Sequence, residues 1–127
     1  MKNSILVLIL FYAISCKEDE PVVSKNHVKY EVLASSGLWV GEYIVGSGEK
    51  LCTCDESSPL KPSGWIYEFD VTTKPFVLHI DASTDCICRG DVGAPDITTN
   101  IYVNNVLVES NSHVWAPGVV SSDYIIE

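Results

Sequence analysis

The sequence predicts an all-β domain, an antiparallel immunoglobulin-like β-sandwich of about seven to eight strands. Three observations support this prediction: apolar residues recur at every second position, turn-forming residues separate these runs, and no stretch has convincing helical periodicity. Strands buried on one face alternate apolar and polar side chains, whereas a surface helix repeats every 3.6 residues. Short strands separated by turns favour a sandwich over a barrel.

The expected strands follow in order from residue 28. Segment 38–45 is strand-like, although its inner face is not clear from the pattern. Four other segments alternate clearly, and their apolar faces consist of Val28, Tyr30 and Val32; Trp65, Tyr67, Phe69 and Val71; Phe76, Leu78, Ile80 and Ala82; and Ile97, Thr99, Ile101 and Val103.

Turn signals mark the ends of the later strands. Asn104-Asn105 lies between the apolar runs 101–103 and 106–108, and it predicts a two-residue hairpin because asparagine tolerates positive φ. Ala116-Pro117-Gly118 predicts a turn into a last strand, Val119 to Ile126.

The first residues have the pattern of an export signal. Lys2 precedes an apolar run at 5–12, which is shorter than the ~20 residues that a membrane-spanning helix needs. The run fits the apolar part of a cleaved signal peptide, about 7–15 residues long. Ala13-Ile14-Ser15-Cys16 resembles the bacterial lipobox, in which the cysteine is acylated and becomes the new N-terminus. We therefore expect a lipoprotein signal peptide at 1–15 and lipidation of Cys16.

The remaining chain divides into a tether and one domain. We expect the lipidated Cys16 and an acidic tether over 16–26, and the β-sandwich domain over 27–127. Acyl chains on Cys16 would hold the protein on the outer membrane. Lys17-Glu18-Asp19-Glu20 resembles the surface-export signal of some Gram-negative lipoproteins, which indicates display at the cell surface. The periplasmic face is the alternative, with the charged run then only a solvated tether.

The net charge excludes some partners. The chain carries 8 basic and 17 acidic residues, and loss of Lys2 with the signal leaves 7 against 17, or −10. Nucleic-acid binding needs clustered Lys and Arg, so no nucleic-acid partner is expected. Direct adhesion to an anionic lipid surface is disfavoured for the same reason.

Four further cysteines form two Cys-x-Cys pairs, Cys52 with Cys54 and Cys86 with Cys88. In a strand, residues i and i+2 lie roughly 6.5–7 Å apart, too far for a disulfide unless the strand bends. On neighbouring antiparallel strands Cys52 would face Cys88 and Cys54 would face Cys86. Because an exported protein meets an oxidising compartment, we expect these facing cysteines to form two disulfides. The alternative is a four-thiolate zinc or copper(I) site with His79 nearby, although structural zinc sites favour a Cys-x₂₋₄-Cys spacing.

Other motifs suggest functions but are weak. His79 beside Asp81 could serve acid–base chemistry, but it is more typical of an exposed strand histidine. Calcium favours oxygen-rich loops, and Asp81, Asp85, Asp91 and Asp96 lie in or near one loop, but their spacing is not that of an EF-hand. Arg89-Gly90-Asp91 is the tripeptide that integrins bind. Trp39, Trp65 and Trp115 could line a carbohydrate groove, although most tryptophans of a small sandwich are core residues.

The order of strand motifs also resembles a known family. Val28–Val32, Trp65–Val71, Phe76–Ala82 and the hairpin Ile101-Tyr102-Val103-Asn104-Asn105-Val106-Leu107-Val108 are similar to small bacterial lipoproteins that resemble the mycobacterial membrane-protein-small (MmpS-like) transport accessory domain. The resemblance implies an immunoglobulin-like sandwich without enzyme activity, and it supplies no site residues.

Together these patterns predict a non-enzymatic binding or assembly accessory module with a protein partner in the cell envelope. A surface carbohydrate- or metal-binding protein is the alternative, and a small hydrolase is a third, weaker reading. The sequence contains no nucleophile motif such as Gly-x-Ser-x-Gly, and we assign no catalytic residue, cofactor or metal ligand.

Overall fold

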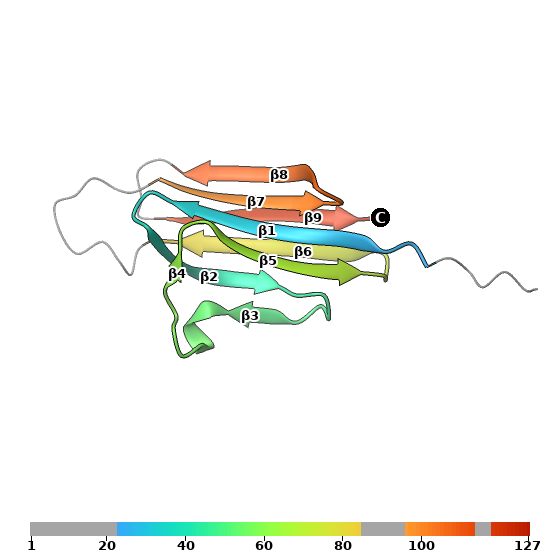
Figure 1. The fold of residues 1–127 in the computed structure, drawn as a ribbon, viewed down its shortest axis with the longest axis horizontal. Helices are drawn as coiled ribbons and strands as arrows, with labels where there is room; N and C mark the ends of the chain where they lie inside the picture. Colours follow the sequence, from blue (N-terminus) through green and yellow to red (C-terminus); the bar gives the residue numbers. More distant parts are fainter. Residues whose placement is uncertain (1–22, 85–95, 114–117) are drawn as a thin grey trace, which may run out of the picture.

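A computed structural model of the protein describes residues 23–84, 96–113 and 118–127. In this part of the chain, nine strands form two antiparallel sheets that face each other as the layers of a sandwich (Figure 1). The predicted fold class, an all-β antiparallel sandwich, is confirmed. No helix among the described residues is long and apolar enough to cross a membrane.

The elements are β1 (Asn26–Ala34), β2 (Leu38–Ile44), β3 (Lys50–Cys52), the 3-10 turn η1 (Thr53–Asp55), β4 (Lys61–Pro62), β5 (Trp65–Val71), β6 (Phe76–Ser83), β7 (Ile97–Val103), β8 (Val106–His113) and β9 (Val119–Ile126). Strands β3 and β4 have three and two residues, too few to show a periodic pattern.

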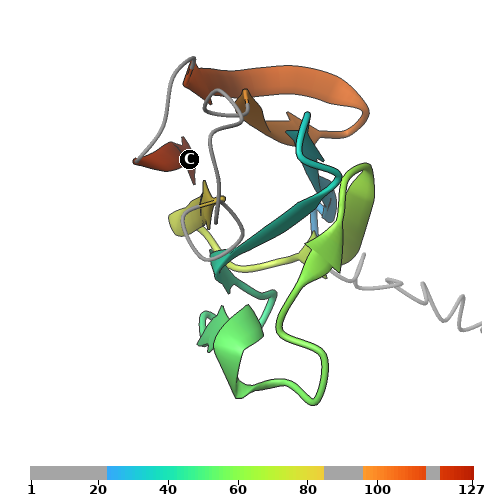
Figure 2. The same ribbon diagram turned by 90° about the vertical axis from the view of Figure 1, so that its left-hand side faces the viewer.

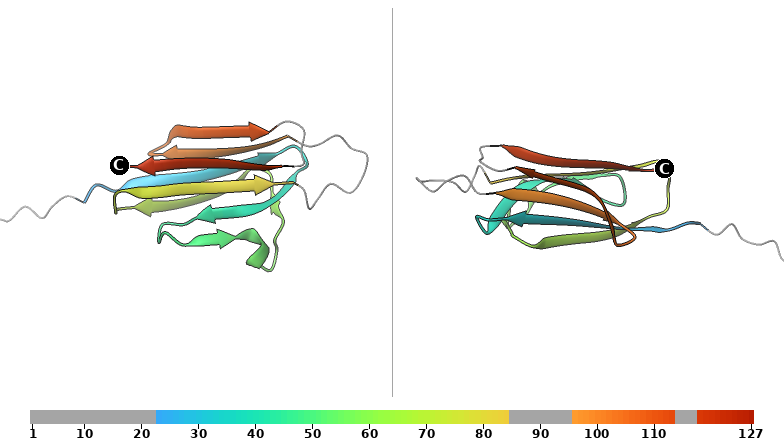
Figure 3. Two further views of the ribbon diagram at one scale, coloured as in Figure 1. Left: turned by 180° about the vertical axis from the view of Figure 1, so that it is seen from behind. Right: turned by 90° about the horizontal axis from the view of Figure 1, so that it is seen from above.

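Among the described residues, one sheet has the strand order β5-β1-β7-β8 and the other has the order β3-β2-β6-β9, with β4 also paired to β2. Many consecutive strands lie in opposite sheets, since the chain crosses the sandwich from β1 to β2, from β5 to β6 and from β8 to β9 (Figure 3). The β7–β8 hairpin stays within one sheet. Asn104 and Asn105 have φ of 51° and 65° at its tip, which confirms the predicted two-residue turn.

The core lies between the sheets and contains the faces that alternation predicts. The inward residues of β1 and β6 are buried, and those of β5 are half-buried except for Val71. The inner face of β2, which the sequence left open, is formed by Trp39 and Tyr43. The largest fully buried side chains are Trp39, Tyr30, Leu78, Ile80, Ile97 and Ile101.

The two long edges of the sandwich are closed in different ways (Figure 2). At one edge the chain passes from β4 in one sheet to β5 in the other, and the amide of Gly64 donates to the Val32 carbonyl at 2.8 Å. At the other edge β8 lies beside β9, and the side-chain amide of Asn111 donates to the Ser121 carbonyl at 3.0 Å.

The Tyr30 hydroxyl joins the two sheets. Pairing between β2 and β6 ends at Tyr43 and Ile80. Just beyond that point, the Tyr30 hydroxyl donates to the Ile44 carbonyl at 3.0 Å and accepts from the His79 amide at 3.3 Å. Tyr30 is fully buried, and burial holds the pKa of its hydroxyl well above the ordinary value.

Several predicted features lie outside the described residues. These are the signal peptide at 1–15, Cys16 and most of the tether, Cys86 and Cys88, Asp85, the Arg89-Gly90-Asp91 tripeptide and Trp115.

Candidate functional site

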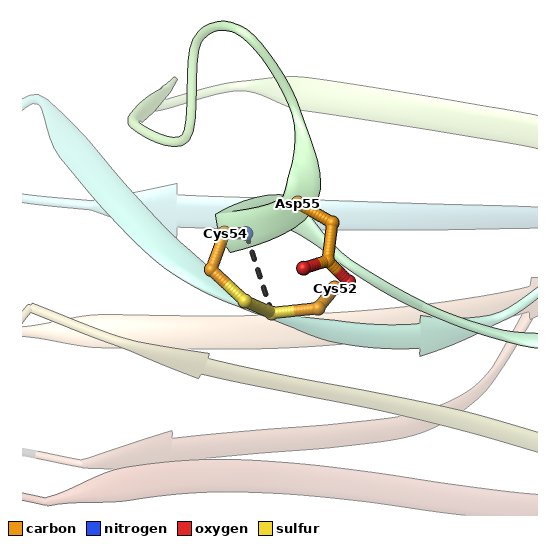
Figure 4. Close-up of side chains that lie close together, drawn as sticks. All are labelled: Cys52, Cys54 and Asp55. Atoms are coloured by element: carbon orange, nitrogen blue, oxygen red, sulfur yellow. Dashed lines mark hydrogen bonds between the residues drawn. A yellow bond between two sulfur atoms is a disulfide. The ribbon is translucent and has the colours of Figure 1, made fainter.

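Cys52 and Cys54 form a disulfide in a tight turn at the end of β3 (Figure 4). The extended strand ends at Cys52, and η1 follows at once. This turn brings the two Cα atoms to 5.2 Å, within the range for a disulfide. The predicted pairing of Cys52 with Cys88 and of Cys54 with Cys86 is therefore wrong, because it assumed that the strand continues through Cys54.

Thr53 anchors this turn to the sandwich. Its side chain is fully buried, and its hydroxyl accepts a hydrogen bond from the Gly41 amide of β2 at 3.1 Å. The Thr53 carbonyl also accepts from the Glu56 amide at 3.2 Å. Gly41 itself admits no side chain, because a Cβ there would overlap the Asp81 carbonyl of β6. The Thr53 hydroxyl thus continues the β2–β3 pairing after β3 has ended.

The disulfide contributes little to the stability of the fold. On the chain-entropy estimate, a ring over three residues stabilises by about 1.5 kcal/mol, whereas the predicted 54–86 link would have given roughly 3–4 kcal/mol. The short bridge fixes the local turn and leaves the association of the sheets to the core.

Asp55 completes a group of possible metal ligands with the two cysteines. The ligand atoms of Cys52, Cys54 and Asp55 all lie within 4.8 Å of one another (Figure 4). Thiolates bind soft cations, but sulfurs joined in a disulfide are not thiolates. In its oxidised form, the group is therefore not a thiolate metal site.

The surroundings of the bridge are acidic. Glu42, the cross-strand partner of Cys52, pairs with Lys50, and Glu56 pairs with Lys61. Asp55 forms no ion pair within the described residues, so one negative charge beside the bridge is not neutralised. The Tyr43 hydroxyl lies 3.5 Å from the Glu56 carboxylate. Burial, and to a smaller extent this carboxylate, raises the pKa of the Tyr43 hydroxyl.

A chain of aromatic rings packs next to this segment. Trp39 is fully buried, and its indole N–H donates to the Pro62 carbonyl at 3.2 Å. Trp65 is half-buried and meets Trp39 edge to face at a centroid distance of 5.1 Å. Of the three tryptophans predicted to line a carbohydrate groove, Trp39 belongs to the core. Trp65 instead stacks near Tyr67, with 12° between the rings.

His79 lies between two carboxylates on the outer face of β6. Its Nδ1 is 2.7 Å from the Asp123 carboxylate of β9, and its Nε2 is 3.5 Å from that of Asp81. Asp81 also accepts from the Glu42 amide at 2.7 Å. The predicted His79–Asp81 neighbourhood exists, with Asp123 as a partner that sequence order could not reveal.

A pocket of about 500 Å³ lies at the end of the sandwich where the described chain begins. It is lined by Asn26, Lys74, Val103, Tyr124, Ile125, Ile126 and Glu127. Nδ2 of the buried Asn26 has no hydrogen-bond partner among the described residues. The pocket contains none of the sequence-predicted site residues.

No protein-family model matches the chain, and no curated protein matches it.

The structural roles of two residues were not predicted from the sequence. Nothing in the alternation marks Thr53 as buried, or Tyr30 as the bond between the sheets. A signal for the turn does exist, since residues 55–59 read Asp-Glu-Ser-Ser-Pro, a run of turn-forming residues directly after Cys54.

Proposed function

We propose that the protein is a lipid-anchored module of the bacterial outer membrane that acts by binding a protein partner in the cell envelope and has no catalytic role. Cys16 carries the acyl chains, residues 17–25 form the tether, and the sandwich domain, which begins with β1 at Asn26, is displayed at the cell surface. The resemblance to MmpS-like transport accessory domains supports the same class of function.

The position of the chain ends is the observation that supports this proposal. The described chain enters the sandwich at the same end at which Glu127 lies (Figures 1 and 3). A fully extended tether of about ten residues spans at most ~35 Å. In this proposal the membrane lies toward this end, and the η1 end, with the Cys52–Cys54 turn, points away from it and meets the partner.

The geometry around His79 favours binding over catalysis. The histidine and its two carboxylates lie on the outer face of the sheet, and none of them lines the pocket at the tether end. An enzyme site needs a cleft in which such groups converge on a substrate.

Carbohydrate binding is the second candidate. The half-exposed, nearly parallel rings of Trp65 and Tyr67 supply aromatic surface of the kind on which sugars stack. If this candidate is correct, Trp65→Ala abolishes binding to cell-wall glycans, whereas the exposed Ile66→Ala on the opposite face of the same strand leaves it intact.

The anchor is tested by metabolic labelling with a palmitate analogue and membrane fractionation. We expect label and membrane association in the wild type, and neither in Cys16→Ser. A control variant, Ser24→Ala in the tether, should behave as the wild type does. Membrane association of Cys16→Ser would contradict the lipid anchor.

The binding end is tested with a photo-cross-linking residue placed at Ser57, next to η1, or at Asn105, at the β7–β8 tip. Both positions are exposed, and they lie at opposite ends of the sandwich. We expect a discrete cross-linked envelope protein from position 57 and none from position 105. Equal cross-linking from both positions would contradict an oriented module.

A further inference from the structure

We propose that the Cys52–Cys54 disulfide is a thiol–disulfide exchange site, which an external thiol opens by attack on Cys54 while the sandwich stays folded. This activity is covalent, and it depends neither on the lipid anchor nor on the binding partner proposed above.

The turn is held in place without the bridge. Thr53, between the two cysteines, is fully buried and accepts the Gly41 amide at 3.1 Å. Cys52 belongs to β3, whose residues Lys50–Cys52 pair with Glu42–Ile44 of β2. Cys52 and Thr53 are therefore held by contacts that do not involve sulfur, and opening the bond leaves those contacts in place.

The two sulfurs differ in access and in stabilisation. Cys54 is exposed, whereas Cys52 is half-buried. The Cys54 amide lies 3.2 Å from Sγ of Cys52 and donates a hydrogen bond to it (Figure 4). A hydrogen bond to sulfur stabilises the thiolate form and lowers its basicity, and the sulfur that leaves as the more stable thiolate leaves faster. Attack is therefore expected at Cys54, with Cys52 as the leaving group.

The reaction balances with a thiol as the only co-reactant. A thiolate forms a new S–S bond to Cys54, the Cys52–Cys54 bond breaks, and its electron pair leaves on Cys52, which takes up a proton. A second thiolate then attacks the external sulfur of this mixed disulfide and releases the Cys54 thiolate, which is also protonated. Two external thiols are oxidised to one disulfide, and the protein disulfide is reduced by two electrons.

The local charge specifies the class of thiol. Asp55 has a carboxylate oxygen within 4.8 Å of both sulfurs and no ion-pair partner among the described residues, while Glu42 and Glu56 each pair with a lysine. A thiol on a positively charged group is attracted to this carboxylate, and one on an anionic group is repelled. At ~5 Å in water each effect is worth up to a few-fold in rate. The preferred substrate is a cationic thiol.

Exchange is measured on the full chain by rapid quenching with an alkylating reagent. Cleavage after glutamate isolates residues 50–56, which contain Cys52 and Cys54 apart from Cys86 and Cys88. With cysteamine as the probe, we expect the mixed disulfide on Cys54 in at least about tenfold excess over Cys52, with an unchanged circular dichroism spectrum. Equal labelling of both cysteines, or opening only under conditions that unfold the chain, would overturn the proposal.

Charge selectivity provides the second readout. We expect cysteamine to open the bridge ~3- to 10-fold faster than 3-mercaptopropionate after correction for thiol pKa, and Asp55→Asn to remove most of this ratio. Cys86→Ser/Cys88→Ser keeps the other pair from contributing and should leave both rates unchanged. If that variant does not fold, the peptide map of the wild type gives the same comparison. A ratio that is unchanged in Asp55→Asn would contradict the assigned substrate class.

Discussion

Two hydroxyls extend the pairing of the central strand β2, and they do so in different surroundings. Thr53 accepts the Gly41 amide on the β3 side, whereas Tyr30 bridges the Ile44 carbonyl and the His79 amide on the β6 side. Both side chains are fully buried. Of the two residues, only Thr53 is flanked by a disulfide, and that disulfide closes a ring over just three residues. The comparison indicates that buried hydrogen bonds stabilise this fold more than its described disulfide does.

The largest effect is expected from Tyr30→Phe. This variant leaves a part-buried carbonyl and a part-buried amide without the Tyr30 hydroxyl as partner, which should lower the free energy of unfolding by about 2–4 kcal/mol. Denaturant unfolding measures this loss. Tyr124→Phe is the matched control, because the Tyr124 ring packs against the same core and its hydroxyl has no hydrogen-bond partner among the described residues. A loss of similar size in both variants would show that the bridging hydrogen bonds of Tyr30 do not contribute to stability.

Thr53→Val should have a smaller effect, because it leaves only the Gly41 amide unpaired. We expect a loss of about 1–3 kcal/mol in the free energy of unfolding. Thr98 is half-buried but its hydroxyl contact with Ser112 is exposed, so Thr98→Val should cost less than about 0.5 kcal/mol. If Thr53→Val lowers the free energy of unfolding no more than Thr98→Val does, the Thr53 hydroxyl does not anchor the turn.

Alkaline pH distinguishes the two hydroxyls, because only tyrosine titrates. Burial raises the pKa of Tyr30 in the folded protein above its unfolded value of about 10. The contribution of the neutral Tyr30 hydroxyl to the free energy of unfolding is therefore complete below pH ~10. It is lost above that pH, by up to about 1.4 kcal/mol per pH unit. Unfolding measured between pH 9 and 11, values chosen to bracket the unfolded pKa of about 10, should show this slope in the wild type and a shallower slope in Tyr30→Phe. Equal slopes would assign the effect to other tyrosines.

The smallest effect on stability is expected from removal of the bridge. Cys52→Ala/Cys54→Ala should lower the free energy of unfolding by no more than about 1.5 kcal/mol, the entropy of a three-residue ring. The circular dichroism spectrum should not change. A loss of 3 kcal/mol or more, about twice the ring estimate, would mean that the bridge and Thr53 do not act separately.

The sequence was informative wherever a strand has one buried face. The alternation at Phe76–Ala82 and the Asn104-Asn105 tip both identify structures that are present. Alternation is a local property, so it could not reveal that β1 lies between β5 and β7, or that Asp123 of β9 meets His79 of β6.

The prediction for the disulfide failed for a physical reason of the same kind. Facing Cys-x-Cys pairs require both strands to be extended, and three residues carry too little pattern to show where β3 ends. Whether a strand continues through Cys54 depends on the burial of Thr53, which is a tertiary contact. The candidate site could therefore be located from the sequence by its cysteines but not assembled.

Disulfide mapping of the unreduced protein shows whether the Cys52–Cys54 bridge is local to the turn. Trypsin is unsuitable, because it does not cleave at Lys61 or Lys74, each of which is followed by proline. Cys52, Cys54, Cys86 and Cys88 would therefore stay in one peptide. Cleavage after glutamate separates residues 50–56 from residues 69–109, which contain Cys86 and Cys88. We expect a free 50–56 peptide that is two hydrogens lighter than its reduced form. A peptide 50–56 that is cross-linked to 69–109 would contradict it.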